Sequence, residues 1–459
     1  MTRLSRAALA VFIALALAAA LRPTPAHADD KPEYTGVAAC NKALALLKEN
    51  KPKDALKVLE DAKDTIDDED KWLWWGNSGL CHRDLREDDE ALKCYEQAVK
   101  LKPDCWFVLR YAEMLHLFGR WDDALEQLDA EIARGGSSQR TEEFRNVILG
   151  PWRERWPHAW KKLEMTSKLG NYHVVSDYGV TEDEMDELEK QLTELDPEDR
   201  HDAKKIEKLL KPADDLGQLC DLMEYVRQRY MSFVGMKERD WPKGRVIKVF
   251  FFRTEQGFND FSAMTGGEGS EHVAGFYDPN HYYLQLFGGQ GGRRVYGIDE
   301  ESLDTLIHEG WHQFFHVLAE NVPTWLNEGL AEFLGKFELK QGGKSIELGT
   351  LVRARKDNYT RYEDIRTAIR EGKYIPIKEF LHLTRDKWDA KDLDVAYAEA
   401  WSLAYYALKG NNSAFKKNYI KLFWGCVEGK NWQDLVDELF DEKDYEPLQA
   451  AWLKYMQNL

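Results

Sequence analysis

The first regular pattern of hydrophobic and polar positions in the chain repeats at intervals of 36 and 33 residues. Within it an acidic residue, Ala and Leu recur together, at Asp54-Ala55-Leu56, Glu90-Ala91-Leu92 and Asp123-Ala124-Leu125. Small residues recur where two helices of a repeat cross closely, because a larger side chain would push the helices apart. Three copies are the minimum for a stable stack. The pattern predicts a domain of helical repeats over residues 36–137.

Helical spacing also dominates the chain that follows the repeats. Leu188, Leu192 and Leu195 lie at helical spacing in a mostly charged stretch, and the helical pattern continues from Leu219 to Tyr230. We interpret residues 138–240 as a helical linker region.

The period then changes to that of β-strands. The run from Val246 to Phe252 is rich in β-branched and aromatic residues, which favours a strand. Gly275 to Tyr277 and Tyr282 to Phe287 flank the turn sequence Asp278-Pro279-Asn280, so these two segments predict a hairpin. Gly288 to Gly292 lacks the Lys-Ser/Thr of a phosphate-binding loop, and we interpret it as a linker or lid.

From Glu300 to Leu459 the pattern is almost wholly helical. The predicted fold class is therefore mainly α with a small α+β part. The small sheet and the helices after it form a second domain over residues 241–459, which ends in a helical tail.

Composition indicates a globular protein, with 43% hydrophobic and 31% charged residues. The formal net charge of −18 argues against nucleic acid as a partner, because phosphates require a basic surface. The six cysteines show no spacing typical of a zinc knuckle. Cys81 and Cys94 could bridge two antiparallel helices, but buried free thiols fit the pattern equally well, so the pairing stays open.

The N-terminus predicts a signal peptide over residues 1–28. Arg3 and Arg6 precede an apolar run from Ala7 to Leu21, and Ala26-His27-Ala28 then forms an A-x-A cleavage site. A membrane anchor is the alternative, but 15 apolar residues are short for a span. We therefore predict an exported protein, periplasmic or extracellular, with no membrane span after cleavage.

The clearest chemical signature is His308-Glu309-Gly310-Trp311-His312. Two histidines at i and i+4 lie on one face of a helix, where both imidazoles can bind one Zn²⁺. Glu309 lies beside that face and can take a proton from water on the metal. With 12 histidines in 459 residues, chance would give roughly 0.03 matches to this pattern in the chain. Surface histidines on an amphipathic helix are the alternative interpretation.

A third ligand would decide between these interpretations. His316 lies two turns beyond His308, about 12 Å along the helix axis, which is too far for one ion. Glu328 stands in the first turns of the next predicted helix, and the 15 residues after His312 are enough to set the two helices side by side. Glu332 follows one turn later on the same face, where it could hydrogen-bond a ligand imidazole.

The repeats resemble the tetratricopeptide repeat. The second copy carries that family's large residue, small crossing residues and closing proline, at Trp75, Gly79, His82, Ala91, Tyr95, Ala98 and Pro103. The resemblance implies a protein partner, because such stacks bind peptides or helices on their concave faces. We also expect the repeats to be a separable module, so that a chain starting near Gln139 folds without them.

The two later motifs resemble the gluzincins, the thermolysin-like metallopeptidases whose third zinc ligand is a Glu on the next helix. His-Glu-Gly-Trp-His and Trp-Leu-Asn-Glu-Gly-Leu-Ala-Glu-Phe carry this resemblance. Residues 275–279 and 397–403 are similar, more narrowly, to peptidase-MA-like domains of unknown function in exported bacterial proteins. The resemblance covers roughly residues 245–410 and implies a sheet whose edge strand binds extended peptide, followed by the zinc helix pair.

The same resemblance implies roles for individual residues. His308, His312 and Glu328 would hold one Zn²⁺ per chain, and Glu309 would deprotonate the water that attacks a peptide carbonyl. Tyr397 would donate a hydrogen bond to the oxyanion, although a tyrosine on an apolar helix is as often part of the core. No GxMEN-type motif is present, so aminopeptidase specificity does not carry over.

The sequence thus predicts an exported, zinc-dependent metallopeptidase that hydrolyses peptide bonds and binds a protein partner or substrate through its repeats. The alternative is a non-enzymatic envelope scaffold that retains the zinc site for structure only. The presence of Glu309 argues against the scaffold, because a structural zinc site needs no general base.

Overall fold

The computed structural model describes residues 33–135, 138–195, 202–266, 274–288, 294–295, 298–340, 345–351 and 360–459. The predicted signal peptide lies outside these residues, as does most of the glycine-rich segment 288–292. Among the described residues, no helix is both long enough and apolar enough to cross a membrane.

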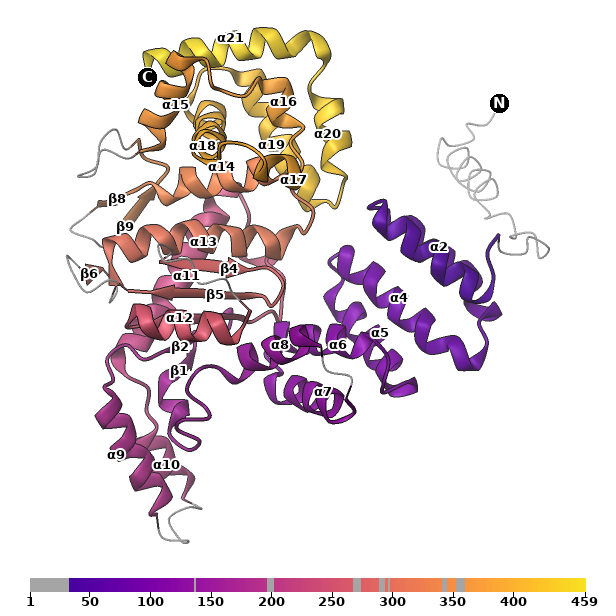
Figure 1. The fold of residues 1–459 in the computed structure, drawn as a ribbon, viewed down its shortest axis with the longest axis vertical. Helices are drawn as coiled ribbons and strands as arrows, with labels where there is room; N and C mark the ends of the chain where they lie inside the picture. Colours follow the sequence, from indigo (N-terminus) through magenta and orange to yellow (C-terminus); the bar gives the residue numbers. More distant parts are fainter. Residues whose placement is uncertain are drawn as a thin grey trace, which may run out of the picture.

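The predicted helical repeats are confirmed as paired helices in the described part of the N-terminal region (Figure 1). Gly79 on α4 allows a close crossing with α5, because a Cβ added there would lie 2.7 Å from the ring of Tyr95. Ala91 and Ala98 are fully buried in the same interface, as the recurrence of small residues predicts. The helices are α2 (Gly36–Lys48), α3 (Pro52–Ala62), α4 (Lys71–Asp84), α5 (Asp88–Leu101), α6 (Phe107–Leu117), α7 (Trp121–Ala133) and α8 (Gln139–Leu149).

A mixed sheet of five strands forms the centre of the described molecule. Its strands lie in the order β1-β2-β3-β5-β4. β2, β3 and β5 run parallel, while β1 and β4 are antiparallel to their neighbours at the two edges. The predicted strand after the linker and the predicted hairpin are confirmed as β3, β4 and β5. The bounds are β1 (Glu164–Thr166), β2 (Tyr172–Ser176), β3 (Ile247–Phe252), β4 (Gly275–Asp278) and β5 (Tyr283–Phe287).

Residues 138–240, interpreted as a helical linker region, also contain two strands, β1 and β2. β2 is a completely buried strand that pairs in parallel with β3, more than seventy positions later in the sequence. His173 and Ser176 interrupt its apolar run, and a parallel partner so distant in sequence leaves no local signal. The helical pattern is confirmed for the rest, at α9 (Glu182–Thr193), α10 (Ala203–Leu209) and α11 (Asp214–Val234).

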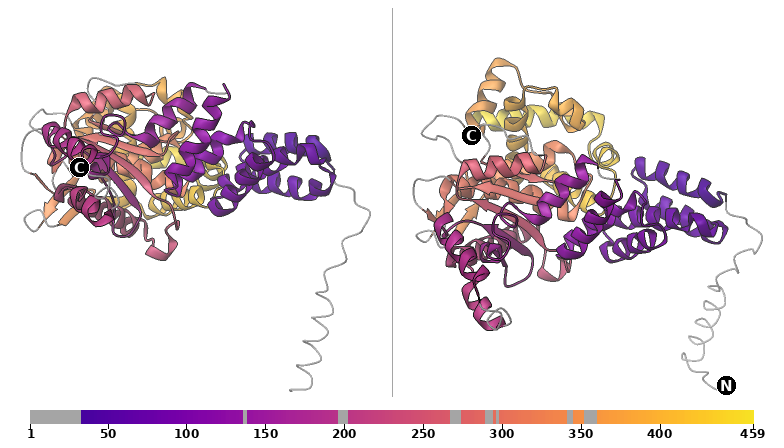
Figure 2. Two further views of the ribbon diagram at one scale, coloured as in Figure 1. Left: turned by 90° about the horizontal axis from the view of Figure 1, so that it is seen from below. Right: turned by 60° about the horizontal axis from the view of Figure 1, so that its bottom comes forward.

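The two faces of the sheet are covered by different parts of the chain. Helices α11 and α13 (Glu300–Leu318) pack on one face against Val249, Phe251 and Leu284. The other face carries Phe250 and Phe252, which share a core with α12 (Glu255–Met264), α8 and the repeat helix α6. Figure 2 shows the remaining repeats projecting away from the rest of the molecule.

This shared core argues against the prediction that the repeats are a separable module. His116 on α6 lies edge-on to Phe144 of α8, and the backbone N–H of Val246 donates to the carbonyl of Leu117 at 2.8 Å. Because the last repeat helices cover the sheet, a chain starting at Gln139 would expose part of that core.

Where the structure describes the region after residue 300, it is helical as predicted except for one hairpin, β8 (Phe337–Lys340) and β9 (Ser345–Leu348). The hairpin follows α14 directly, and Ile346 is buried in the main core. All six cysteines lie within the described residues, and each is free and buried. The helices are α14 (Thr324–Gly335), α15 (Arg361–Glu371), α16 (Ile377–Leu381), α17 (Arg385–Asp389), α18 (Leu393–Lys409), α19 (Ser413–Val427), α20 (Trp432–Leu439) and α21 (Glu442–Asn458).

Candidate metal centre

Helix α13 carries the first two candidate ligands and is fixed firmly to the sheet. Its apolar face is fully buried, including Leu306, Trp311 and Phe314. The Asp299 carboxylate accepts the N–H of Ser302 at 3.0 Å and so caps the first turn. Gly310 belongs to the motif for a packing reason, because a Cβ there would lie 3.2 Å from the hydroxyl of Tyr230. The other face of the helix, which carries His308 and His312, lines a cavity.

Helix α14 brings the third candidate ligand beside α13. Gly329 permits very close packing, since a Cβ at this position would lie 2.5 Å from the carbonyl oxygen of Ala400 on α18. This contact fixes the rotation of α14 and directs Glu328, its neighbour in sequence, toward the histidines.

The three side chains meet at one point. His308 Nε2 and His312 Nε2 lie 3.2 Å apart, and Glu328 Oε2 lies 3.3 Å from His312 Nε2 and 3.7 Å from His308 Nε2. In a tetrahedral zinc site with bonds of about 2.0–2.1 Å, neighbouring ligand atoms lie about 3.3–3.4 Å apart. Glu328 Oε2 is buried, and its near neighbours are the Nε2 atoms of the two histidines. The donor set and its spacing therefore fit one zinc ion.

The charges around this point also favour a bound cation. Burial lowers the pKa of His312, but the Glu328 carboxylate, with smaller contributions from Glu309 and Asn327, raises that pKa to about 9. Burial raises the pKa of Glu328, yet His312 and His308 bring it below its ordinary value. The ionised Glu328 carboxylate thus favours a positive charge between the two imidazole rings. A proton and a metal ion would compete for this position.

Glu309 lies next to the ligands without joining them. Its Oε1 is 3.9 Å from His308 Nε2, and its Oε2 accepts a hydrogen bond from the backbone N–H of Tyr277 at 3.0 Å. Tyr277 belongs to the edge strand β4. The carboxylate is 18% exposed, so water can reach it. An edge strand therefore holds the predicted general base in place, a contact that the sequence did not indicate.

Glu332 does not form the predicted hydrogen bond to a ligand imidazole. Its carboxylate binds Arg361 instead, with both Nε and a terminal nitrogen 3.0 Å from Oε1. Burial raises the pKa of Glu332, but Arg361 and then His308 bring it below its ordinary value. Glu332 therefore acts on His308 through its charge rather than through a hydrogen bond.

Asn327 is a neighbour of the site that the sequence analysis missed. It precedes Glu328, lines the same cavity, and its side chain helps to raise the pKa of His312. The only signal for Asn327 in the sequence was its position. It is next to the predicted ligand Glu328 and lies on the side of the helix turn that faces away from the apolar core.

Tyr397 lines the cavity that contains the cluster. This cavity has a volume of about 530 Å³ and is also lined by Glu309 and Arg385. The Tyr397 ring packs edge-on against Trp388, 5.3 Å between centroids, while burial and the nearby Glu328 raise the pKa of its hydroxyl. The tyrosine is thus placed beside the three ligands rather than in the interior of the core.

His316 lies outside the three-residue cluster, as the helical spacing predicts. Its Nδ1 is hydrogen-bonded to the hydroxyl of Tyr277 at 2.7 Å, and its ring stacks on Tyr282. Burial and the nearby Arg86 lower the pKa of His316 to about 4, which keeps the ring neutral.

Comparison with known proteins identifies two regions. Residues 72–105 match the tetratricopeptide repeat, and residues 302–422 match a family described as protein of unknown function (DUF1570). The second match includes the three candidate ligands, Glu309 and Tyr397. No curated protein matches the chain. The tetratricopeptide repeat indicates protein partners, while the second family assigns no activity.

Proposed function

We propose that this protein is an exported zinc metallopeptidase of the gluzincin type, which hydrolyses peptide bonds of a protein or peptide substrate. The observation that carries the proposal is the spacing of the three ligand atoms, with Glu309 held beside them. A scaffold that uses zinc for structure alone would have no need to hold an additional carboxylate there.

When bound, zinc would supply the Lewis acid that polarises the substrate carbonyl and makes water more acidic. His308, His312 and Glu328 would hold the ion. Glu309 accepts a proton from the attacking water and returns it to the leaving amine, and the N–H of Tyr277 keeps its carboxylate oriented during both transfers.

The shape of the site supports a polypeptide substrate. The cavity at the cluster adjoins a second cavity of about 390 Å³, and Ala319 and Glu320 line both. The second cavity lies between the repeats and the C-terminal helices, with Arg83 and Arg86 on the repeat side. A polypeptide bound at the cluster would therefore extend along the repeats. The repeats and the catalytic region of the protein would then act on the same substrate molecule.

Replacing Glu309 by glutamine tests this proposal. Because the change removes only the proton acceptor, zinc content and fold should be retained while kcat/KM for peptide hydrolysis falls about 10²–10⁴-fold. The activity is measured on a peptide library derived from a proteome, with zinc quantified in the same samples.

Glu300→Gln is the matched control, since it makes the same substitution at an exposed position on the same helix. It should leave hydrolysis unchanged. Wild-type protein with a full complement of zinc that cleaves nothing in the library would contradict the proposal and favour the scaffold.

Tyr397→Phe tests the predicted oxyanion donor. Removal of one hydroxyl should lower kcat about 10²–10³-fold, with KM and zinc content nearly unchanged, because the donor acts on charge that develops in the transition state. Tyr405→Phe, on the same helix but outside the cavity lining, is the control and should retain full kcat. Equal kcat in both variants would return Tyr397 to a packing role.

A further inference from the structure

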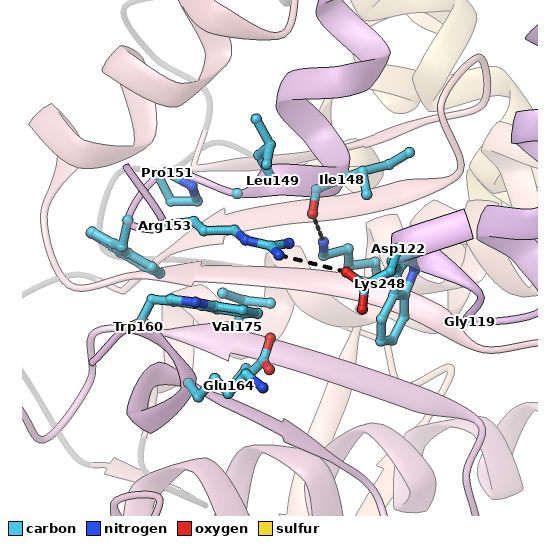
Figure 3. A pocket seen from close by; sticks show the side chains of 14 residues that line it. Gly119, Asp122, Ile148, Leu149, Pro151, Arg153, Trp160, Glu164, Val175 and Lys248 are labelled. Atoms are coloured by element: carbon cyan, nitrogen blue, oxygen red, sulfur yellow. Dashed lines mark hydrogen bonds and ion pairs between the residues drawn. The ribbon is translucent and has the colours of Figure 1, made fainter. Parts of the chain in front are cut away.

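Another cavity, of about 190 Å³ and separate from the two described above, lies on the face of the sheet opposite α13. It is bounded by the start of α7, the end of α8, the segment that follows α8, and strands β2 and β3 (Figure 3). Three tryptophans line it, Trp121, Trp152 and Trp160. None of the residues around the metal cluster contributes to this cavity, so it is a separate feature of the molecule.

The most unusual residue in its wall is Lys248. This lysine is the second residue of β3 and is only 4% exposed. Its ammonium group donates to the carbonyl of Ile148 at 2.6 Å, one of the last carbonyls of α8, which have no partner within the helix. No carboxylate among the described residues forms an ion pair with it, and its other near neighbours are the rings of Trp121 and Phe250.

A buried ammonium without a counter-ion is costly, and proteins normally pair such a charge. Burial lowers the pKa of Lys248 to about 7, and Glu164 offsets this effect only in part. An anionic group placed in the cavity would supply the missing partner.

Three other charged groups of the wall, Arg153, Asp122 and Glu164, are already engaged. Arg153 lies 3.5 Å from Asp122 and over the ring of Trp160, and Figure 3 shows its guanidinium directed into the cavity. Glu164 is paired with His173 at 3.1 Å. Lys161, Arg153 and Lys248 line the wall together with two acids, Asp122 and Glu164, and a carboxylate in the cavity would favour the protonated form of Lys248.

The size and the aromatic lining limit the body of such a ligand. A cavity of about 150 Å³ is sufficient to hold benzene. Indole rings favour flat or apolar groups stacked on them. Trp121 in addition contributes a buried Nε1 that has no acceptor among the described residues.

We propose that this cavity binds a small organic monocarboxylate with a flat apolar body, its carboxylate paired with Lys248 and its ring between the tryptophans. The carboxylate could belong to a free acid or to the C-terminal residue of a peptide, since both present the same group. The proposal is independent of the peptidase activity, because it uses none of the residues of the metal cluster.

Benzoate is a suitable probe, with benzamide as its uncharged counterpart. We expect benzoate to change the tryptophan fluorescence of the full chain and to bind at least 10-fold more tightly than benzamide. Two further probes distinguish a free acid from the C-terminal residue of a peptide. Hippurate represents a small free acid, and a short peptide ending in Phe represents a peptide terminus. Only a site open to peptide termini would bind the peptide.

Lys248→Met keeps the length of the side chain and removes its charge, so benzoate affinity should fall at least 10-fold. Lys168→Met, at a lysine that is 86% exposed and outside the cavity, should bind like the wild type. Equal affinity of the wild type for benzoate and benzamide, or no binding of either, would overturn the proposal even if Lys248→Met failed to fold.

Discussion

Replacing His312 by alanine should leave the purified protein without zinc, whereas the wild type should contain one ion per chain. The same loss is expected for His308→Ala and Glu328→Ala, because each removes one of three ligand atoms that lie 3.2–3.7 Å from one another. Elemental analysis after dialysis against a zinc buffer measures the content directly.

Thermal unfolding provides a second measurement of the same site. Zinc at about 100 times its Kd should stabilise the folded wild type by about 2.7 kcal/mol, because the ion binds the folded state preferentially. The three ligand variants should show no such increase in Tm on addition of zinc.

Two histidine variants are the controls. His158→Ala changes a ring that is 58% exposed, and His316→Ala changes a ring that lies outside the cluster. Both should retain one zinc ion, although His316→Ala also removes the bond to Tyr277 and should unfold at a lower temperature. Full zinc content in a folded His312→Ala protein would contradict the proposed metal centre.

The metal cluster was accessible to sequence analysis because its geometry is largely local. Two histidines four residues apart on a helix must lie one turn apart, and Glu328 needed only a second helix beside the first. Glu332 was placed correctly on the same face, but its hydrogen bond goes to Arg361, which is almost thirty positions later in the chain. A carboxylate near several donors binds the one that tertiary packing brings within reach, and helical spacing does not specify that choice.

The contacts that support the cluster could not be found from the same pattern. The N–H of Tyr277 reaches Glu309 because β4 is the edge of the sheet and α13 packs against it, which depends on strand order rather than on any motif. Strand order in turn depends on β2, which the sequence analysis had assigned to a helical linker. Parallel pairing of strands far apart in the chain is the step at which local periodicity carries no information.

The position of the repeats illustrates a related difficulty. The repeat pattern described the helices correctly, yet it suggested a module because each repeat contacts mainly its neighbours. In the structure the last helices contact the sheet, and an ion pair links the second repeat to it. Arg245, just before β3, donates to both carboxylate oxygens of Asp88 at 2.5 and 2.8 Å. Arg86, in the connection between α4 and α5, donates to the carbonyl of His316 near the end of α13.

Replacing Asp88 by alanine should therefore destabilise the whole protein rather than the repeats alone. Arg245 is 3% exposed, and burial opposes its charge, while the hydrogen bonds to Asp88 raise its pKa. Removal of the carboxylate leaves a buried guanidinium without its counter-ion, which costs about 3–5 kcal/mol of folding free energy. Denaturant unfolding followed by circular dichroism measures this difference.

Asp89→Ala is the matched control, because Asp89 occupies the next position in the first turn of α5 and is exposed. It should cost only the loss of a favourable charge at a helix N-terminus, about 0.3–1 kcal/mol. The double variant Asp88→Ala/Arg245→Met should recover part of the stability, since it removes the unpaired charge together with its partner. If Asp88→Ala were no less stable than Asp89→Ala, the ion pair would not couple the repeats to the sheet, and the shared apolar core alone would have to hold the two regions together.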